Sequence, residues 1–432
     1  MLRRHFLKGA AALATMGPAL AAGAGRPVLA AESGQGRYLV PGYVPSSAFF
    51  HGRPVAEQPA FTKAIPSGYD GLTTMVTRID ERDGAVKRAL FPMVGHEITV
   101  RPDRRSAFFN SMDDKIMLTF DPDSLELGAV AEAHHRQFTG GGHAIHGPGG
   151  ELIVSERHNY VRYSGQPEKH YGRIVVRDPE SLRVIEVYNS HGIAPHQIAQ
   201  LAGEQAIAVT HYGSTSWPGS GDYGELPYIV EPCLTVIDLR NGKLLHKEVG
   251  QDKRFDLRHL AVHGRDRIFA IQGRLAPMAE VQEVMKDWAE IYEPDVWSAS
   301  EEVGYLPAPV LRYDLTQPDT RPKPVSTDDP LLMRYGQSIV FDPVNDEAIA
   351  TFPSRHAVVV FAGADGSVKR VIRTDRLGLH QPRGLAFHPD GRRYAVSGYW
   401  RNIQLFERGS HEPDPDGRVH TTFFGHSHLT LT

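Results

Sequence analysis

The stretch that decides the fold runs from residue 143 to residue 187 and contains four short apolar runs separated by turns. In chain order its pieces are His143-Ala144-Ile145-His146, Gly147-Pro148-Gly149-Gly150, Leu152-Ile153-Val154, Ile174-Val175-Val176-Arg177-Asp178 and Val184-Ile185-Glu186-Val187. Short runs rich in Val and Ile and bounded by Gly, Pro or Asp are typical of β-strands. The stretch therefore predicts one four-stranded sheet, with its strands consecutive in the chain.

This unit recurs along the chain at intervals of about 40–50 residues, the period of propeller blades. Six units begin near residues 94, 141, 194, 257, 335 and 381, and a first unit covers Tyr38 to Phe91. The sequence predicts an all-β fold, a seven-bladed β-propeller, with Thr421–Phe424 as a possible added strand that closes the ring. The alternative, two β-sandwich domains, would not explain the repeated register.

One blade is predicted to carry a short helical insertion within residues 273–308. Its apolar residues follow helical spacing: Val281, Val284, Met285, Trp288 and Ile291. The helix could pack on its blade or act as a lid. Two further long loops, 157–171 and 212–231, are expected to return to the same end of the channel, which marks that end as the functional one.

The composition excludes several function classes. The 432-residue chain has a formal charge of −4, and removing residues 1–30, with four basic residues and no acid, gives −4 − 4 = −8. An acidic chain without a basic cluster argues against nucleic acid and anionic membranes as partners. No apolar run reaches the 18 residues or more of a membrane span, and no glycine-rich phosphate loop indicates a nucleotide cofactor. Cys233 is the only cysteine and is read as a small buried hydrophobe.

The N-terminus resembles a twin-arginine export signal. Arg3-Arg4-His5-Phe6-Leu7-Lys8 precedes an alanine-rich, weakly hydrophobic stretch, and small-residue cleavage sites follow. We therefore expect residues 1–30 to be a signal peptide, residues 31–432 to form the propeller, and the mature protein to be periplasmic. The alternative is a chance basic start before a disordered lead.

Four of the units begin with a histidine at one equivalent position, which we call the anchor. The four anchors are His96, His143, His196 and His259, and the next two units hold Gln337 and Arg383 there. Because inner strands line the channel of a propeller, we expect the anchors to form a polar layer at its mouth. Two residues beyond each anchor stand only apolar residues, which predicts an apolar plug beneath: Ile98, Ile145, Ile198, Ala261, Ile339 and Leu385.

Neutral imidazole is a common ligand of transition metals, so four imidazoles in one layer predict a metal site. Ligands from one side leave open positions, which favours Fe(II) or Cu(II) over a closed structural zinc site. Of these two metals we expect Fe(II) rather than Cu(II). Glu97, Glu156 and Glu231 are candidate acceptors for the second ring nitrogens, and Gln337 with Arg383 could complete the pocket. Alternatively, the anchors are structural or polar filler.

Other histidines are predicted to lie outside the site. The pairs His134-His135 and His426-Ser427-His428 are expected to be exposed on the surface.

The chain also resembles a bacterial family of unknown function. The resemblance rests on His191-Gly192-Ile193-Ala194-Pro195-His196-Gln197-Ile198, on Glu231-Pro232 and on Leu257-Arg258-His259-Leu260-Ala261. It implies a twin-arginine-exported propeller similar to the quinoprotein amine dehydrogenase β chain and to YVTN-repeat proteins. It further implies an iron-regulated setting with imelysin-like and di-haem thiol-oxidoreductase-like partners. Carotenoid-cleaving oxygenases, which hold Fe(II) through four histidines on a propeller axis, offer an analogy of fold alone.

Two functions remain open from the sequence. The first is a periplasmic propeller that binds iron, or copper, through the four anchors for iron acquisition or a metal-dependent oxidation. The second is a non-catalytic propeller that binds a protein of an iron-uptake system. A propeller hydrolase or lactonase lacks the acidic calcium ligands that it would need.

Overall fold

The computed structural model describes residues 36–432, with gaps at 46–48, 51–52, 55–71, 113, 160–162, 216–228, 286–302, 318–320, 330 and 425–427. The predicted signal peptide, residues 1–30, lies outside the described residues. So do Trp288 and Ile291 of the predicted helix.

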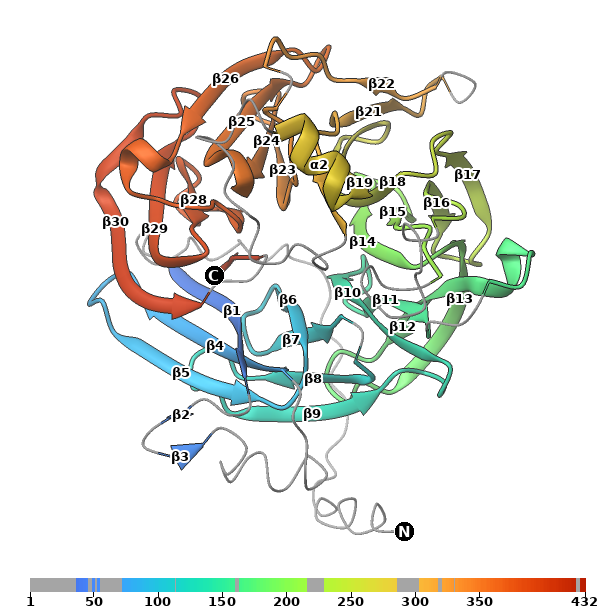
Figure 1. Ribbon diagram of the computed structural model, residues 1–432. Coiled ribbons are helices and arrows are strands. Elements are labelled where there is room, and N and C mark those ends of the chain that lie inside the picture. The colour runs from blue at the N-terminus through green and yellow to red at the C-terminus, as the bar shows by residue number, and fades with distance from the viewer. Residues whose placement is uncertain are drawn as a thin grey trace, which may run out of the picture. The chain divides into compact units, whose positions relative to one another are not determined.

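Seven antiparallel sheets surround a common axis, which confirms the predicted seven-bladed β-propeller (Figure 1). Blades two to four are consecutive in the chain: β6 (Gly95–Val100), β7 (Ala107–Ser111), β8 (Ile116–Phe120), β9 (Leu127–Glu132); β10 (Phe138–His146), β11 (Leu152–His158), β12 (Tyr171–Arg177), β13 (Val184–Ile193); β14 (Pro195–Gln200), β15 (Ala206–His211), β16 (Cys233–Asp238), β17 (Leu244–Val249). A 3-10 helix, Pro167–His170, precedes β12. In each blade the first strand lies innermost.

Blades five to seven follow the same plan: β18 (Phe255–His263), β19 (Arg267–Pro277), β21 (Leu311–Asp314), β22 (Lys323–Pro324); β23 (Ser338–Asp342), β24 (Glu347–Phe352), β25 (Ala357–Ala362), β26 (Val368–Arg373); β27 (Leu385–Phe387), β28 (Arg393–Ser397), β29 (Trp400–Glu407), β30 (Pro413–Phe424). Short 3-10 helices lie at Pro353–Arg355 and Asp375–Leu377. A further strand, β20 (Val303–Leu306), pairs with β19.

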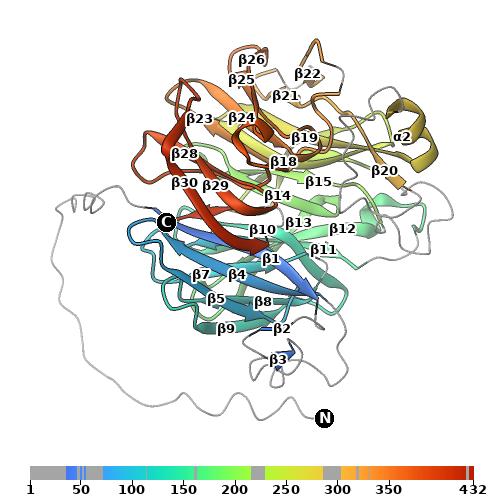
Figure 2. The ribbon, with the colours of Figure 1, turned by 60° about the vertical axis from the view of Figure 1, so that its left-hand side comes forward.

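The predicted helical insertion is confirmed as α2 (Met278–Met285), which continues β19 and contacts β20 (Figure 2). Val281 is fully buried and packs with Ala276, Leu306 and Leu331. This packing supports the reading of a helix that stabilises its blade. No helix among the described residues is long and apolar enough to cross a membrane.

The first blade joins the two ends of the chain. It contains β31 (Thr430–Leu431), β1 (Arg37–Pro45), β4 (Leu72–Asp80) and β5 (Val86–Phe91), with β31 innermost. The prediction that Thr421–Phe424 closes the ring is wrong, because these residues end β30, the outer strand of the seventh blade. The ring of blades is instead closed by β31. A separate hairpin pairs β2 (Phe49–Phe50) with β3 (Arg53–Pro54).

The hydrophobic core is divided into layers between consecutive blades, including one between the seventh and the first. Ile98 lies between blades one and two, Ile198 between three and four, and Leu385 between six and seven. The predicted apolar plug on the axis is therefore wrong. The faces of a blade's sheet turn toward the neighbouring blades, so these side chains fill the layers between sheets.

A recurrent aspartate ends the third strand of five blades and shapes the turn that follows. Asp80, Asp121, Asp178, Asp238 and Asp314 each accept a hydrogen bond from the backbone N–H two residues later. Such short side-chain turns fix the step to the outer strand. The predicted strand that ends at Asp178 is thus one instance of a repeated feature.

Candidate metal centre

The four predicted histidines converge at the channel axis, where all are buried. His196 Nε2 lies 3.2 Å from His143 Nε2 and 3.1 Å from His259 Nε2. The ring centroid of His96 lies 5.1 Å from those of His143 and His196. Side chains from four blades therefore meet at one point, as the shared register predicts.

An irregularity in strand pairing accompanies every one of these histidines. In blades two to five the register between first and second strands shifts at the anchor, between Gly95 and Ile98, Gly140 and Ala144, Pro195 and Ile198, and Leu257 and Leu260. In blades six and seven the same strands pair in continuous register. A bulge re-aims a side chain that would otherwise face a neighbouring sheet. We infer that the bulges turn the imidazoles toward the axis.

A fifth imidazole, that of His428, completes the group, which we call the axial cluster. His428 lies two residues before β31, is 8% exposed, and its Nε2 is 3.0 Å from His96 Nε2. The prediction that His428 is exposed is wrong, because the closing strand carries it onto the axis. One ligand atom each from His96, His143, His259 and His428 lie within 4.8 Å of one another, a set that could hold a metal ion.

The hydrogen-bond partners of Nδ1, the outer ring nitrogen, determine which nitrogen of His143 and of His196 carries a proton. His143 Nδ1 lies 2.8 Å from Glu97 Oε2, and His196 Nδ1 lies 2.7 Å from the carbonyl oxygen of Gly141. Burial raises the pKa of Glu97, but the charge and hydrogen bond of His143 outweigh this and hold the pKa below its ordinary value. Glu97 is thus an ionised acceptor, and both Nδ1 atoms must donate.

The inner nitrogen of His196, Nε2, therefore carries a lone pair, and His143 Nε2 lies 3.2 Å from it. Burial lowers the pKa of His196 and His259 well below the ordinary value and that of His428 to about 3, so these rings are neutral near pH 7. The lone pair of His196 can accept a hydrogen bond or bind a cation. Nitrogens about 2.1 Å from one ion, at right angles, would be roughly 3.0 Å apart. The separations suit a shared metal.

The three glutamates predicted to support the site lie in different surroundings. Glu97 contacts His143, as described above. Glu156 is fully buried and binds His134 and Arg177, with 2.7 Å between Glu156 Oε1 and Arg177 Nη2. Glu231 pairs with Lys247 at 2.6 Å. Among the contacts of the described residues, only Glu97 of the three reaches an imidazole of the axial cluster.

We expect the alanine substitution of Glu97 to affect metal affinity and that of Glu156 to affect folding stability. Glu97→Ala should weaken metal binding by about 10–100-fold, the usual effect of removing an outer partner of a ligand histidine, with little loss of stability. Glu156→Ala should lower the free energy of unfolding by about 3–5 kcal/mol, because it strands the buried Arg177, and should leave metal affinity unchanged. Chelator competition and urea unfolding of both variants test this, and a reversed pattern contradicts it.

The two remaining anchors pair with each other beside the cluster. Arg383 Nη1 donates to Gln337 Oε1 at 3.1 Å, and both side chains are buried. The guanidinium also lies 4.8 Å from the ring of Tyr399 and 6.0 Å from that of Tyr335. Seven positions, one from each blade, thus present five imidazoles, one amide and one guanidinium.

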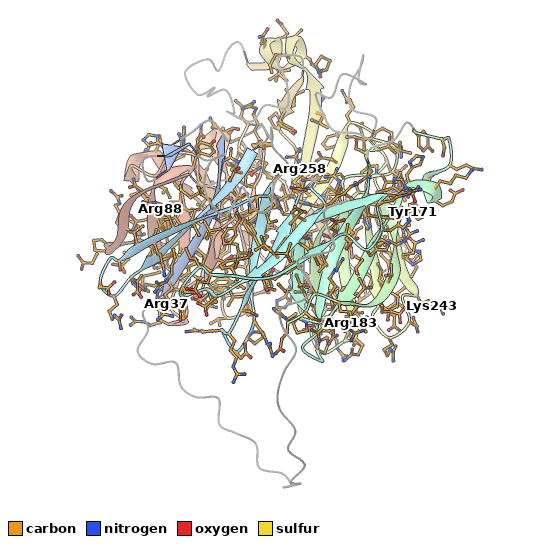
Figure 3. All side chains as sticks on the ribbon, turned by 90° about the horizontal axis from the view of Figure 1, so that it is seen from below. Arg37, Arg88, Tyr171, Arg183, Lys243 and Arg258 are labelled. Atoms are coloured by element: carbon orange, nitrogen blue, oxygen red, sulfur yellow. The ribbon has the colours of Figure 1, made fainter. Side chains whose placement is uncertain are left out.

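A layer of tyrosines and arginines adjoins the axial cluster. Tyr212 places its hydroxyl 3.2 Å from His196 Nε2, and its ring lies within 6 Å of the guanidinium carbons of Arg157 and Arg258. In Figure 3, Arg258 lies toward α2, while Arg183 and Lys243 lie toward the opposite side. The sequence indicated Tyr212 only as part of a long loop. Its contact with His196 could not be predicted.

Comparison with known proteins places the chain in a family. Residues 90–408 match the family described as Protein of unknown function (DUF1513), so the chain belongs to it. No curated protein matches the chain. Among solved structures, the chain is similar to hydrazine synthase of Kuenenia stuttgartiensis, with a TM-score of 0.54 and 12% identity, covering 78% of this chain and 92% of that chain. This similarity concerns the fold alone.

Proposed function

We propose that this member of the DUF1513 family binds a redox-active divalent metal, Fe(II) in preference to Cu(II), in its axial cluster. His96, His143, His259 and His428 would be ligands, and His196 would be a fifth. The metal would serve iron acquisition or a metal-dependent oxidation. When bound, it would supply a redox couple and open positions for an external ligand.

The observation that carries the proposal is the buried set of His96, His143, His259 and His428, which offer ligand atoms that all lie within 4.8 Å of one another. Here Glu97 and the Gly141 carbonyl take the outer protons and direct the inner nitrogens to one point. All-imidazole sets suit iron, copper and zinc, and the neutral rings keep the metal's full positive charge.

The protein would act in the periplasm. A twin-arginine signal in residues 1–30 would export the folded protein with its metal loaded. The partners would be periplasmic iron-uptake proteins of the imelysin-like and di-haem thiol-oxidoreductase-like classes. Iron is preferred because such a setting would supply it.

Metal analysis of the purified exported protein tests the proposal. We expect about one equivalent of metal in the wild type and less than a tenth of that in the His143→Ala/His196→Ala double variant. His211→Ala is the matched control, since His211 is equally buried in the fourth blade and its Nδ1 meets the Cys233 carbonyl. Equal metal contents in wild type and double variant would show that the axial histidines are structural, and partner binding would become the preferred function.

A further inference from the structure

His196 differs from the other members of the axial cluster because a second group competes for its inner nitrogen. The Tyr212 hydroxyl lies 3.2 Å from His196 Nε2, and the two ring centroids are 4.6 Å apart. The ring packing holds the hydroxyl beside the nitrogen. Tyr212 is half-buried, whereas His196 is fully buried.

Because of its protonation, His196 can either accept the hydrogen bond from Tyr212 or bind a metal, but it cannot do both. Its Nδ1 donates to the Gly141 carbonyl, which leaves one lone pair, on Nε2. A tyrosine hydroxyl keeps its proton at neutral pH, so the Tyr212 hydroxyl donates to this nitrogen 3.2 Å away. A single lone pair cannot accept the Tyr212 proton and coordinate a metal at once. The remaining four histidines already form a set within ligand range of one another.

We propose that His196 is an exchangeable ligand, and that Tyr212 decides whether the fifth coordination position is taken by His196 or by a small anion. This inference rests on the proposed metal site. While Tyr212 holds His196, four imidazoles bind the metal and the fifth position is open. When Tyr212 turns away, His196 occupies the position and excludes the external ligand.

The charges around Tyr212 favour an anion over a neutral ligand. The guanidinium carbons of Arg157 and Arg258 lie 5.7 Å and 5.8 Å from the centre of the Tyr212 ring. Arg258 also forms a two-point ion pair with Asp256, with both contacts at 2.8 Å, which fixes its position and offsets its charge, so the attraction for an anion comes mainly from Arg157 and the metal. A divalent metal adds further positive charge beside these guanidiniums. In a buried site of low dielectric, such an arrangement attracts small anions such as azide or carboxylates.

Azide binding to the Cu(II)-loaded full-length protein tests the inference, with the charge-transfer absorbance as the signal. We expect Tyr212→Phe to raise the azide dissociation constant at least tenfold, because an unrestrained His196 fills the fifth position. Pulsed EPR should then count one more coordinated imidazole in the variant than in the wild type. Tyr305→Phe is the matched control, since it removes a hydroxyl from another ring packed on Arg258, at 4.5 Å. The control should bind azide like the wild type.

Two further measurements complete the test. The double variant Tyr212→Phe/His196→Ala should regain wild-type azide affinity, and neutral imidazole should bind the wild type at least tenfold more weakly than azide. An unchanged azide affinity in Tyr212→Phe, with the same nitrogen count, would overturn the inference and leave the metal site intact. A wild-type protein that binds no Cu(II) would instead overturn the proposed function, so the two failures are distinguishable.

Discussion

Replacing Gly142 by alanine is expected to weaken metal binding by at least 100-fold, about 2.7 kcal/mol of binding free energy. Gly142 has a φ of +101°, and a Cβ there would lie 2.8 Å from His96 Cδ2 and 3.1 Å from His196 Cε1. Both contacts are with buried rings of the axial cluster, so the imidazoles must move apart. Ligand geometry is sensitive to such displacements, because metal–imidazole distances vary by only about 0.2 Å. Chelator competition measures the effect.

Gly150→Ala separates the steric effect from backbone strain. Gly150 also has a positive φ, +86°, but an added Cβ there meets nothing within 4 Å. This variant should lose about 1–2 kcal/mol of folding stability through its left-handed backbone, and its metal affinity should stay unchanged. If Gly142→Ala binds metal as tightly as Gly150→Ala does, close packing at Gly142 does not position the imidazoles.

Much of the fold could be predicted because the same strand and turn residues recur along the sequence. Apolar strands such as Leu152-Ile153-Val154, turn residues such as Asp178, and their period of one blade are all written in the sequence. Each blade buries its faces against its neighbours, so seven repeats imply a closed ring. The shared position of four histidines then predicted their convergence, which the structure confirms at 3.1–3.2 Å for two of the pairs.

The orientation of the inner-strand side chains and the fifth histidine could not be predicted from the repeat pattern. A bulge shifts each histidine out of the strand's regular alternation, so the period-two argument wrongly placed Ile98 and Ile198 on the axis. Glycine or proline before three of the histidines was the available signal. His428 was missed because its blade is completed by the far end of the chain. The run His428-Leu429-Thr430-Leu431 resembles the start of an inner strand and could have indicated it.

Deleting residues 428–432 is expected to lower the free energy of unfolding by more than about 4 kcal/mol. The deletion removes β31, the inner strand of the first blade, and with it the bond from Thr430 Oγ1 to the Ile98 carbonyl at 2.6 Å. It also removes Leu429, buried between the first and seventh blades with Tyr38 and Val40, and the loss of one buried leucine costs about 2–5 kcal/mol. Urea unfolding of the metal-free protein measures this loss of stability without any contribution from metal binding. A loss below 1 kcal/mol would show that the ring closes without β31.

His428→Ala isolates the contribution of the metal to the same closure. His428 and His96 lie 332 positions apart, so a metal that binds both would link the closing end of the chain to the second blade. At a metal concentration one hundred times Kd, binding stabilises the wild type by about 2.7 kcal/mol. If the variant binds 100-fold more weakly, the same concentration adds only about 0.4 kcal/mol. The variant without metal should unfold nearly like the metal-free wild type, because β31 and Leu429 remain. Equal metal-induced stabilisation of both proteins would mean that His428 is buried beside the metal without binding it.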